Sequence, residues 1–235
     1  PGGHSNKFPN LANARRCTTF MKHTLTLIFL FISVTLAKAD CLGVGTWYWP
    51  SGNTLNKNPI IIISTGDSNL AVKINTTSPI FLKSSKNKVQ LYIIEICSGG
   101  LNMTQIILKP KSQLIEGEVY ELFIADKKAI KIKSSAKEPR SLKWRVKNEN
   151  DSESPIWKES PSIYSKYFQA SGCGPEIWIH FRFNYFDKSK VQVKAIVKNT
   201  QTGNQRTCYV SQTDLVFKIG HNMCYGELNF DKEKE

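Results

Sequence analysis

The chain of 235 residues carries 32 lysines and arginines against 19 aspartates and glutamates, which gives a formal net charge of +13. A basic balance of this size can indicate a nucleic-acid partner or an anionic surface. The lysines, however, are scattered singly along alternating segments, as at Lys190, Lys194 and Lys198, and no basic block is interleaved with stacking aromatic residues. The charge therefore predicts a solvated lysine-rich face, and we expect no nucleic-acid partner.

Residues 21–39 have the three parts of a secretory signal peptide. A charged n-region precedes the apolar run 25–36, and Ala37-Lys38-Ala39 forms a small-x-small cleavage site. A membrane-spanning helix needs about 20 apolar residues, so this shorter run favours a cleaved signal over an anchor. Lipidation of Cys41 is disfavoured because Asp40, which is not a small residue, precedes it. We expect a secreted, periplasmic or cell-surface protein without a stable transmembrane segment.

Residues 1–20 precede the signal and are treated as an upstream, non-native segment outside the folded protein. The chain starts at Pro1 rather than methionine and stops in the charged run 231–235. The sequence alone leaves open whether the chain is a fragment at either end.

Residues 1–39 hold five basic and no acidic side chains, so the remainder keeps 27 basic against 19 acidic side chains and a net charge near +8. Its roughly 196 residues suffice for one large or two ordinary domains. Short runs of β-branched and aromatic residues, separated by turn residues such as those at 64–67, predict an all-β protein. The expected strands are 60–63, 70–74, 80–82, 89–96, 106–108 and 119–124, followed by 177–185, 191–197, 207–210, 215–219 and 227–230.

Between residues 125 and 151 the composition shifts towards Lys, Ser, Glu and Asn. This shift predicts a boundary between two domains, at 41–130 and 140–235. The alternating run 142–146 would then be either the first strand of the second domain or a late strand of the first.

Residues 108–122 read L-K-P-K-S-Q-L-I-E-G-E-V-Y-E-L. This stretch resembles the late part of bacterial immunoglobulin-like or fibronectin type III-like domains, where an L-x-P … L-x-x-G-x-x-Y-x-L pattern enters a late strand. Pro110, Gly117 and an inward Tyr120 suit that corner. The resemblance implies two tandem β-sandwich domains in an exported protein, where such domains serve as spacers, adhesive modules or accessory binding modules.

Only His180 and His221 lie beyond residue 39, and the chain has no H-E-x-x-H, G-x-S-x-G, Walker or G-x-G-x-x-G motif. These counts disfavour conventional hydrolase chemistry, so we expect a non-enzymatic protein with no cofactor and no metal. An alternative is that Cys173, His221 and Cys224 form a soft-metal site or a Cys–His nucleophile pair.

Five cysteines lie beyond residue 39, and none belongs to a C-x-x-C pair. Export to an oxidising compartment favours disulfides. We predict that Cys173 pairs with Cys224 and Cys41 with Cys97, which leaves Cys208 over. Spacing alone does not settle this connectivity.

Two aromatic sets are candidates for ligand binding, because aromatic rings offer a large contact area at a low entropy cost. The sets are Trp47 with Trp49, and Trp178 with His180 and Arg182. In the structural alternative, Trp47 and Trp49 point into a sheet while Tyr48 points out, and Trp178 covers a domain interface.

The sequence thus predicts a non-enzymatic structural or binding module. Its expected partner is a glycan or another surface protein. The alternatives are a carbohydrate-binding or adhesin module and an accessory domain of a larger secreted enzyme.

Overall fold

The computed structural model describes residues 45–67, 70, 72–74, 78–100, 103–124, 127–129, 131–132, 140–148, 153–171, 174–187, 191–210, 212–213 and 216–228. The predicted upstream segment, the signal peptide, Cys41 and Cys173 lie outside these residues. All described residues belong to one compact unit, Cys41–Glu235. Within them, no helix has the length and apolar character needed to cross a bilayer.

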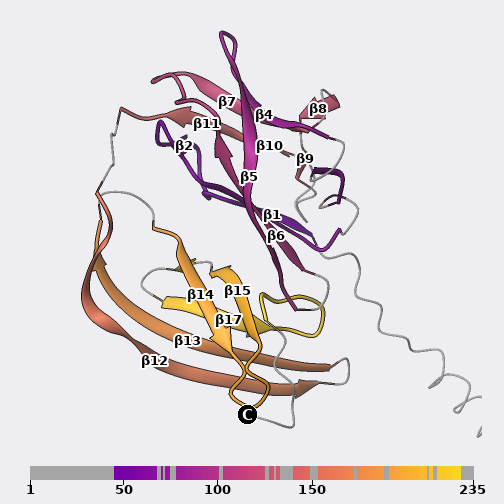
Figure 1. Ribbon diagram of the computed structural model, residues 1–235, viewed down its shortest axis with the longest axis vertical. Helices are drawn as coiled ribbons and strands as arrows, with labels where there is room; N and C mark the ends of the chain where they lie inside the picture. The colour runs from indigo at the N-terminus through magenta and orange to yellow at the C-terminus, as the bar shows by residue number, and fades with distance from the viewer. Residues whose placement is uncertain are drawn as a thin grey trace, which may run out of the picture. The chain divides into compact units, whose positions relative to one another are not determined.

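The described chain is nearly all β, as predicted, and its first half forms a nine-stranded sheet (Figure 1). The sheet follows the path β1-β3-β6-β5-β4-β7-β11-β2, and β8 pairs with β7 off this path. The strands are β1 (Thr46–Trp49), β2 (Thr54–Leu55), β3 (Ile61–Thr65), β4 (Ile80–Lys83), β5 (Lys88–Ser98), β6 (Thr104–Pro110), β7 (Val119–Ile124), β8 (Lys127–Ala129) and β11 (Lys143–Val146).

The chain itself brings the two ends of this path together, because β1 and β2 are consecutive strands joined only by residues 50–53. The sheet therefore curls around its inner face, whose side chains form the main core. Trp144 and Tyr120 are its largest fully buried members, and Trp144 Nε1 donates a hydrogen bond to the Pro50 carbonyl at 3.3 Å. The other buried members are Leu55, Ile61, Ile63, Ile74, Ile80, Leu82, Val89, Leu91, Ile106, Leu108, Leu114, Leu122 and Val146.

The second half forms a four-stranded sheet of order β12-β13-β17-β16 and a separate hairpin, β14–β15 (Figure 1). The strands are β12 (Ile156–Ser171), β13 (Gly174–Phe186), β14 (Val193–Lys198), β15 (Gln205–Val210), β16 (Gln212–Thr213) and β17 (Val216–His221), and a small pair joins β9 (Lys131–Ile132) to β10 (Arg140–Ser141). The period-two alternation of β13 sends Phe181, Phe183 and Tyr185 to one face. These rings pack with Cys208 and Val210 of the hairpin in a second core.

Strand β12, which the sequence did not predict, is the edge of the second sheet, and nearly all of its side chains are exposed. An exposed edge with apolar residues invites pairing with another strand. Pro161 has no backbone N–H to offer, and the register with β13 shifts three times between Trp157 and Ser165. Prolines and bulges of this kind are a common protection against strand addition.

The predicted strand 70–74 is wrong, because Leu70 and residues 72–74 are helical. The Leu70 backbone N–H donates to the carbonyl oxygen of Asp67 at 3.1 Å and to its Oδ1 at 3.3 Å. Asp67 therefore caps a helical turn. Ile74 and Leu70 face the main core while Val72 is exposed, which is the spacing of a helix face.

The alternating run 142–146 contains β11, which pairs antiparallel with β7 and parallel with β2. It is therefore a late strand of the first sheet. Glu227 and Leu228, the described part of the predicted strand 227–230, are not in a strand, and the chain makes an isolated bridge at Gly226 instead. The division into two tandem immunoglobulin-like domains stays a prediction.

Gln105 of β6 joins the first sheet to the hairpin. Its Nε2 donates to the Tyr209 carbonyl at 2.8 Å, and the Tyr209 N–H donates to its Oε1 at 2.7 Å. The buried amide thus pairs with the edge of β15 as a neighbouring strand would.

Glu95 of β5 adds a charged contact to this junction. Lys194 Nζ lies 2.9 Å from both Glu95 carboxylate oxygens, and the Tyr209 hydroxyl donates to one of them at 2.8 Å. The hydrogen bond from Lys194 lowers the pKa of Glu95, and burial together with Glu95 raises the pKa of Tyr209. The carboxylate is therefore held ionised by two partners from the hairpin.

We expect Gln105→Leu to lower the free energy of unfolding by about 2–4 kcal/mol, because each polar group left unpaired in the interior costs about 1–3 kcal/mol. Urea unfolding measures this loss. The matched control is Gln90→Leu on the exposed side of β5, where we expect a change within about 0.5 kcal/mol. Equal effects of the two substitutions would contradict the role of the Gln105 amide.

Candidate functional site

The two tryptophans of β1 do not form one open platform. Trp47 is exposed, but its ring contacts that of Tyr225 in a tilted arrangement, with centroids 5.0 Å apart. Trp49 is half-buried and packs in a small cluster with Ile62. Tyr48 packs against the main core, and burial raises its pKa. The orientation is thus the reverse of the structural alternative, since Tyr48 points in.

Trp178 is 3% exposed, so it is not the exposed stacking residue that the sequence predicted. Lys218 Nζ lies 3.7 Å from the centroid of the Trp178 ring, and Trp178 Nε1 donates a hydrogen bond to Glu176 Oε1 at 2.6 Å. Trp178 therefore forms a floor beneath a cation instead of a surface for a ligand.

The other two predicted residues of β13, His180 and Arg182, lie on the face of the second sheet opposite the hairpin. His180 is paired directly with Ser165 of β12 and Lys218 of β17, and directly paired residues share a face. His180 Nδ1 and Ser165 Oγ are 2.8 Å apart. We call this surface the tyrosine–arginine face, with the members Tyr164, Ser165, Tyr167, His180, Arg182 and Lys218.

Two tyrosines of β12 supply the exposed rings of this face. Tyr164 is 57% exposed, and Arg182 Cζ lies 4.4 Å from the centroid of its ring. Tyr167 is 41% exposed and pairs directly with Trp178. The face thus combines exposed aromatic rings, hydroxyl groups and cations on a hydrogen-bonded sheet. Sequence reasoning missed Tyr164, Tyr167 and Lys218. A spacing of three places two tyrosines on opposite faces of a regular strand, and the register shift between Ile163 and Ser165 is what lets Tyr164 reach this face.

A hollow of about 500 Å³ lies elsewhere, over β4, β7 and β11. Two lysines that line it contact other lining residues. Lys143 Nζ lies 3.8 Å from Glu121 Oε2, and Lys83 Nζ lies 5.8 Å from the centroid of the Phe123 ring. The lining residues are Lys83, Ser84, Ser85, Gly117, Glu118, Val119, Glu121, Phe123 and Lys143.

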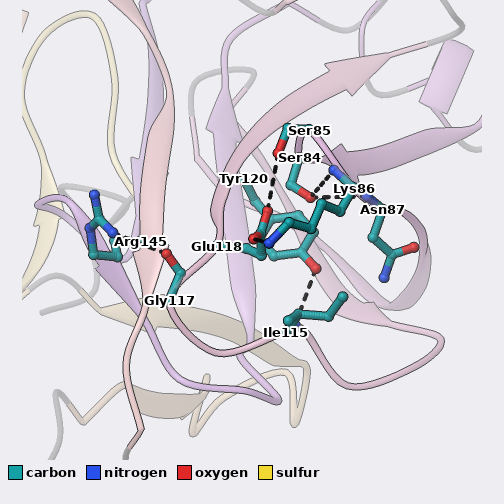
Figure 2. A network of polar contacts seen from close by, with 9 residues as sticks. All are labelled: Ser84, Ser85, Lys86, Asn87, Ile115, Gly117, Glu118, Tyr120 and Arg145. Carbon is teal, nitrogen blue, oxygen red and sulfur yellow. Dashed lines mark hydrogen bonds and ion pairs between the residues drawn. The ribbon is translucent and has the colours of Figure 1, made fainter.

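Glu118 lines this hollow, and Figure 2 shows the groups that bind its carboxylate. Lys86 Nζ donates to Glu118 Oε1 at 2.8 Å and Ser85 Oγ to Oε2 at 3.3 Å. The hydrogen bond from Lys86 is the main reason that the pKa of Glu118 is lowered. The Ser84 hydroxyl accepts from the backbone N–H groups of Lys86 and Asn87. The network therefore fastens the β4–β5 turn to β7, and its carboxylate is an ionised structural partner.

The string 220–224 forms a capped turn in which His221 is 2% exposed. His221 Nδ1 lies 3.0 Å from the Asn222 carbonyl, which can only accept, so we infer that Nδ1 carries the proton. Asn222 Oδ1 accepts from the backbone N–H groups of Cys224 and Tyr225, both at 2.8 Å. Among the described residues, no three His, Cys, Asp or Glu side chains are grouped as a metal would need.

Cys97 and Cys208 are free, buried thiols. The free state of Cys97 contradicts its predicted pairing with Cys41. Burial, with the charge of Glu95 adding to it, raises the pKa of Cys97 to about 11, and burial raises that of Cys208 to about 12. Both thiols lie in hydrophobic clusters, where each serves as a small apolar packing group.

Cys224 does not titrate as a free thiol. Its predicted partner, Cys173, lies outside the described residues, so the disulfide between them stays a prediction.

Comparison with protein families, with curated proteins and with solved structures finds no match for this chain. The resemblance to immunoglobulin-like domains stays a prediction. Tyr120 does lie inward, as the corner pattern requires, and its hydroxyl accepts from the Ile115 N–H at 3.1 Å (Figure 2).

We expect both Cys97 and Cys208 to resist iodoacetamide in the folded protein, because a thiol with a pKa of about 11 is only roughly one part in a thousand thiolate at pH 8. Both thiols should react readily in urea, where their pKa returns to about 8.5. Peptide mass spectrometry after timed alkylation measures the two rates. Alkylation of either cysteine as fast in the native protein as in urea would contradict the burial described above.

We expect Glu227→Gln to raise the melting temperature at pH 7. Burial raises the pKa of the Glu227 carboxyl, and a hydrogen bond to its own backbone, together with the charge of Lys218, opposes this only in part. Its Oε2 is buried without a hydrogen-bond partner among the described residues. Because the folded pKa exceeds the unfolded one, the folded state binds this proton more tightly, and stability falls as the pH rises from the unfolded towards the folded pKa.

The gain should therefore vanish below the unfolded pKa of about 4.3, where the carboxyl is protonated in both states. Calorimetric melting at several pH values tests this. The control is Glu116→Gln, whose carboxylate is exposed beside Lys57, and which should show no such gain at pH 7. A lower melting temperature for Glu227→Gln at pH 7 would show that the ionised carboxylate is stabilising.

Proposed function

We propose that this chain is a non-enzymatic, exported binding module and that the tyrosine–arginine face holds a glycan. The observation that carries the proposal is the presence of exposed Tyr164 and Tyr167 rings beside Arg182 and His180 on one sheet face. Export is proposed from the signal-like stretch at 21–39.

A glycan suits this face because a sugar ring has an apolar side and a rim of hydroxyl groups. An exposed tyrosine ring offers a large, stiff apolar contact with a polar tip. Arg182 and the Ser165–His180 pair place donors and acceptors beside the rings. Since these side chains stand on paired strands, little ordering is needed when a ligand binds, which favours affinity.

Two features support a non-enzymatic role. His221 is closed off from solvent, so its imidazole has no access to a substrate. In the hollow over β7, the pKa of Glu118 is lowered and the carboxylate is bound by two donors, whereas a general acid needs a raised pKa.

A panel of immobilised neutral and acidic glycans tests the proposal by direct binding. We expect at least one glycan to bind, and Tyr164→Ala or Tyr167→Ala to weaken that binding about tenfold, because each substitution removes a contact of roughly 1–2 kcal/mol.

The matched control is Tyr92→Ala, since Tyr92 lies on β5 of the other sheet and is also 41% exposed. We expect it to leave binding unchanged. Binding that is lost equally in Tyr92→Ala, or no binding to any glycan, would overturn the proposal and favour a structural spacer.

A further inference from the structure

Arg182 and Lys218 are diagonal neighbours on adjacent strands of the tyrosine–arginine face, because Arg182 pairs with Val216 and His180 with Lys218. Diagonal neighbours on one face lie about 7–8 Å apart, and their Cβ atoms are somewhat closer. Both side chains are long and exposed. Their charged ends can therefore reach a single group placed between them.

Each of these cations rests on an aromatic ring. Arg182 Cζ lies 4.4 Å from the centroid of the Tyr164 ring, and Lys218 Nζ lies 3.7 Å from that of Trp178. A cation over a ring is held in position by the ring quadrupole while its outer side stays open to a ligand. Each of the two charges is thus held over its own ring on this face, Arg182 over Tyr164 and Lys218 over Trp178.

The carboxylates of this face lie at its two ends and are already bound. Glu159 accepts from Asn184 Nδ2 at 3.2 Å, and Glu176 accepts from Trp178 Nε1 at 2.6 Å. Between these two rows, the charged side chains that the paired strands place on this face are cationic, and the buried Glu227 carboxyl, whose pKa burial raises, lies within charge range of Lys218. The centre is therefore complementary to a negative charge.

We propose that the glycan on this face is acidic, and that a sugar carboxylate or sulfate is held between Arg182 and Lys218 while a sugar ring lies on Tyr164 or Tyr167. This inference rests on the proposed function and adds the chemical class of the ligand. Arginine suits either group because its planar fork can bind two oxygens at once.

The experiment compares matched polymers that differ only in charge. The probes are polygalacturonate with its fully methyl-esterified form, and a sulfated galactan with its desulfated form, which separates a carboxylate from a sulfate as the bound group. Binding is measured by biolayer interferometry at low and at physiological salt. We expect one acidic polymer to bind at least tenfold more tightly than its neutral form, and more weakly at higher salt.

The protein variants locate the charge. Arg182→Gln and Lys218→Gln should each weaken binding of the acidic polymer about tenfold. The matched control is Lys166→Gln, which removes the same charge from β12 but pairs with Ile179 on the opposite face, and it should stay within twofold. Circular dichroism checks that the variants keep the all-β spectrum.

Each other outcome overturns the inference. If the charged and neutral forms bind equally and Tyr164→Ala still weakens both, the inference that the ligand is acidic is wrong. The proposed glycan-binding function would not be contradicted by that result. An equal loss in Lys166→Gln, or equally tight binding of single-stranded DNA, would show a general attraction of anions to a basic protein. Binding of none of the polymers would remove both proposals.

Discussion

The place of the β14–β15 hairpin beside the first sheet depends on the pairing between the Gln105 side chain and the Tyr209 backbone. An isolated two-stranded hairpin is marginally stable in water, and its free edge exposes unpaired N–H and C=O groups. Gln105 supplies one donor and one acceptor to that edge from within the first sheet. The hairpin is thereby fixed at a place where Glu95 binds both Lys194 and Tyr209.

Fixing the hairpin decides which face of the second sheet is left for a ligand. Because β14 and β15 cover the side of β13 that carries Phe181, Phe183 and Tyr185, the alternate residues His180 and Arg182 remain on the uncovered side. The proposed glycan site is thus a consequence of packing on the opposite face. The Glu118 network is not part of the proposed glycan site. It holds the β4–β5 turn of the first sheet against β7.

Prediction from sequence succeeded where burial leaves a period of two. Strand β13 has one face in a core, so its apolar residues alternate and its strand was expected at 177–185. Strand β12 is an edge strand exposed on both faces, so neither face has to be apolar and no alternation of apolar and polar residues arises. Pro161 is also untypical of a strand interior. The segment 70–74 failed for another reason, since five residues fit either period and the Asp67 cap decided the outcome.

The sequence by itself determined the all-β class, most strand positions and the presence of His180 and Arg182 on one face of a strand, because these follow from local alternation. Only the tertiary structure decided that Trp178 is buried, that Tyr164 and Tyr167 supply the exposed rings, and that Cys97 is free. Those outcomes depend on which strands become neighbours and which faces are covered. Such contacts join residues far apart in the chain, so a local sequence pattern does not predict them.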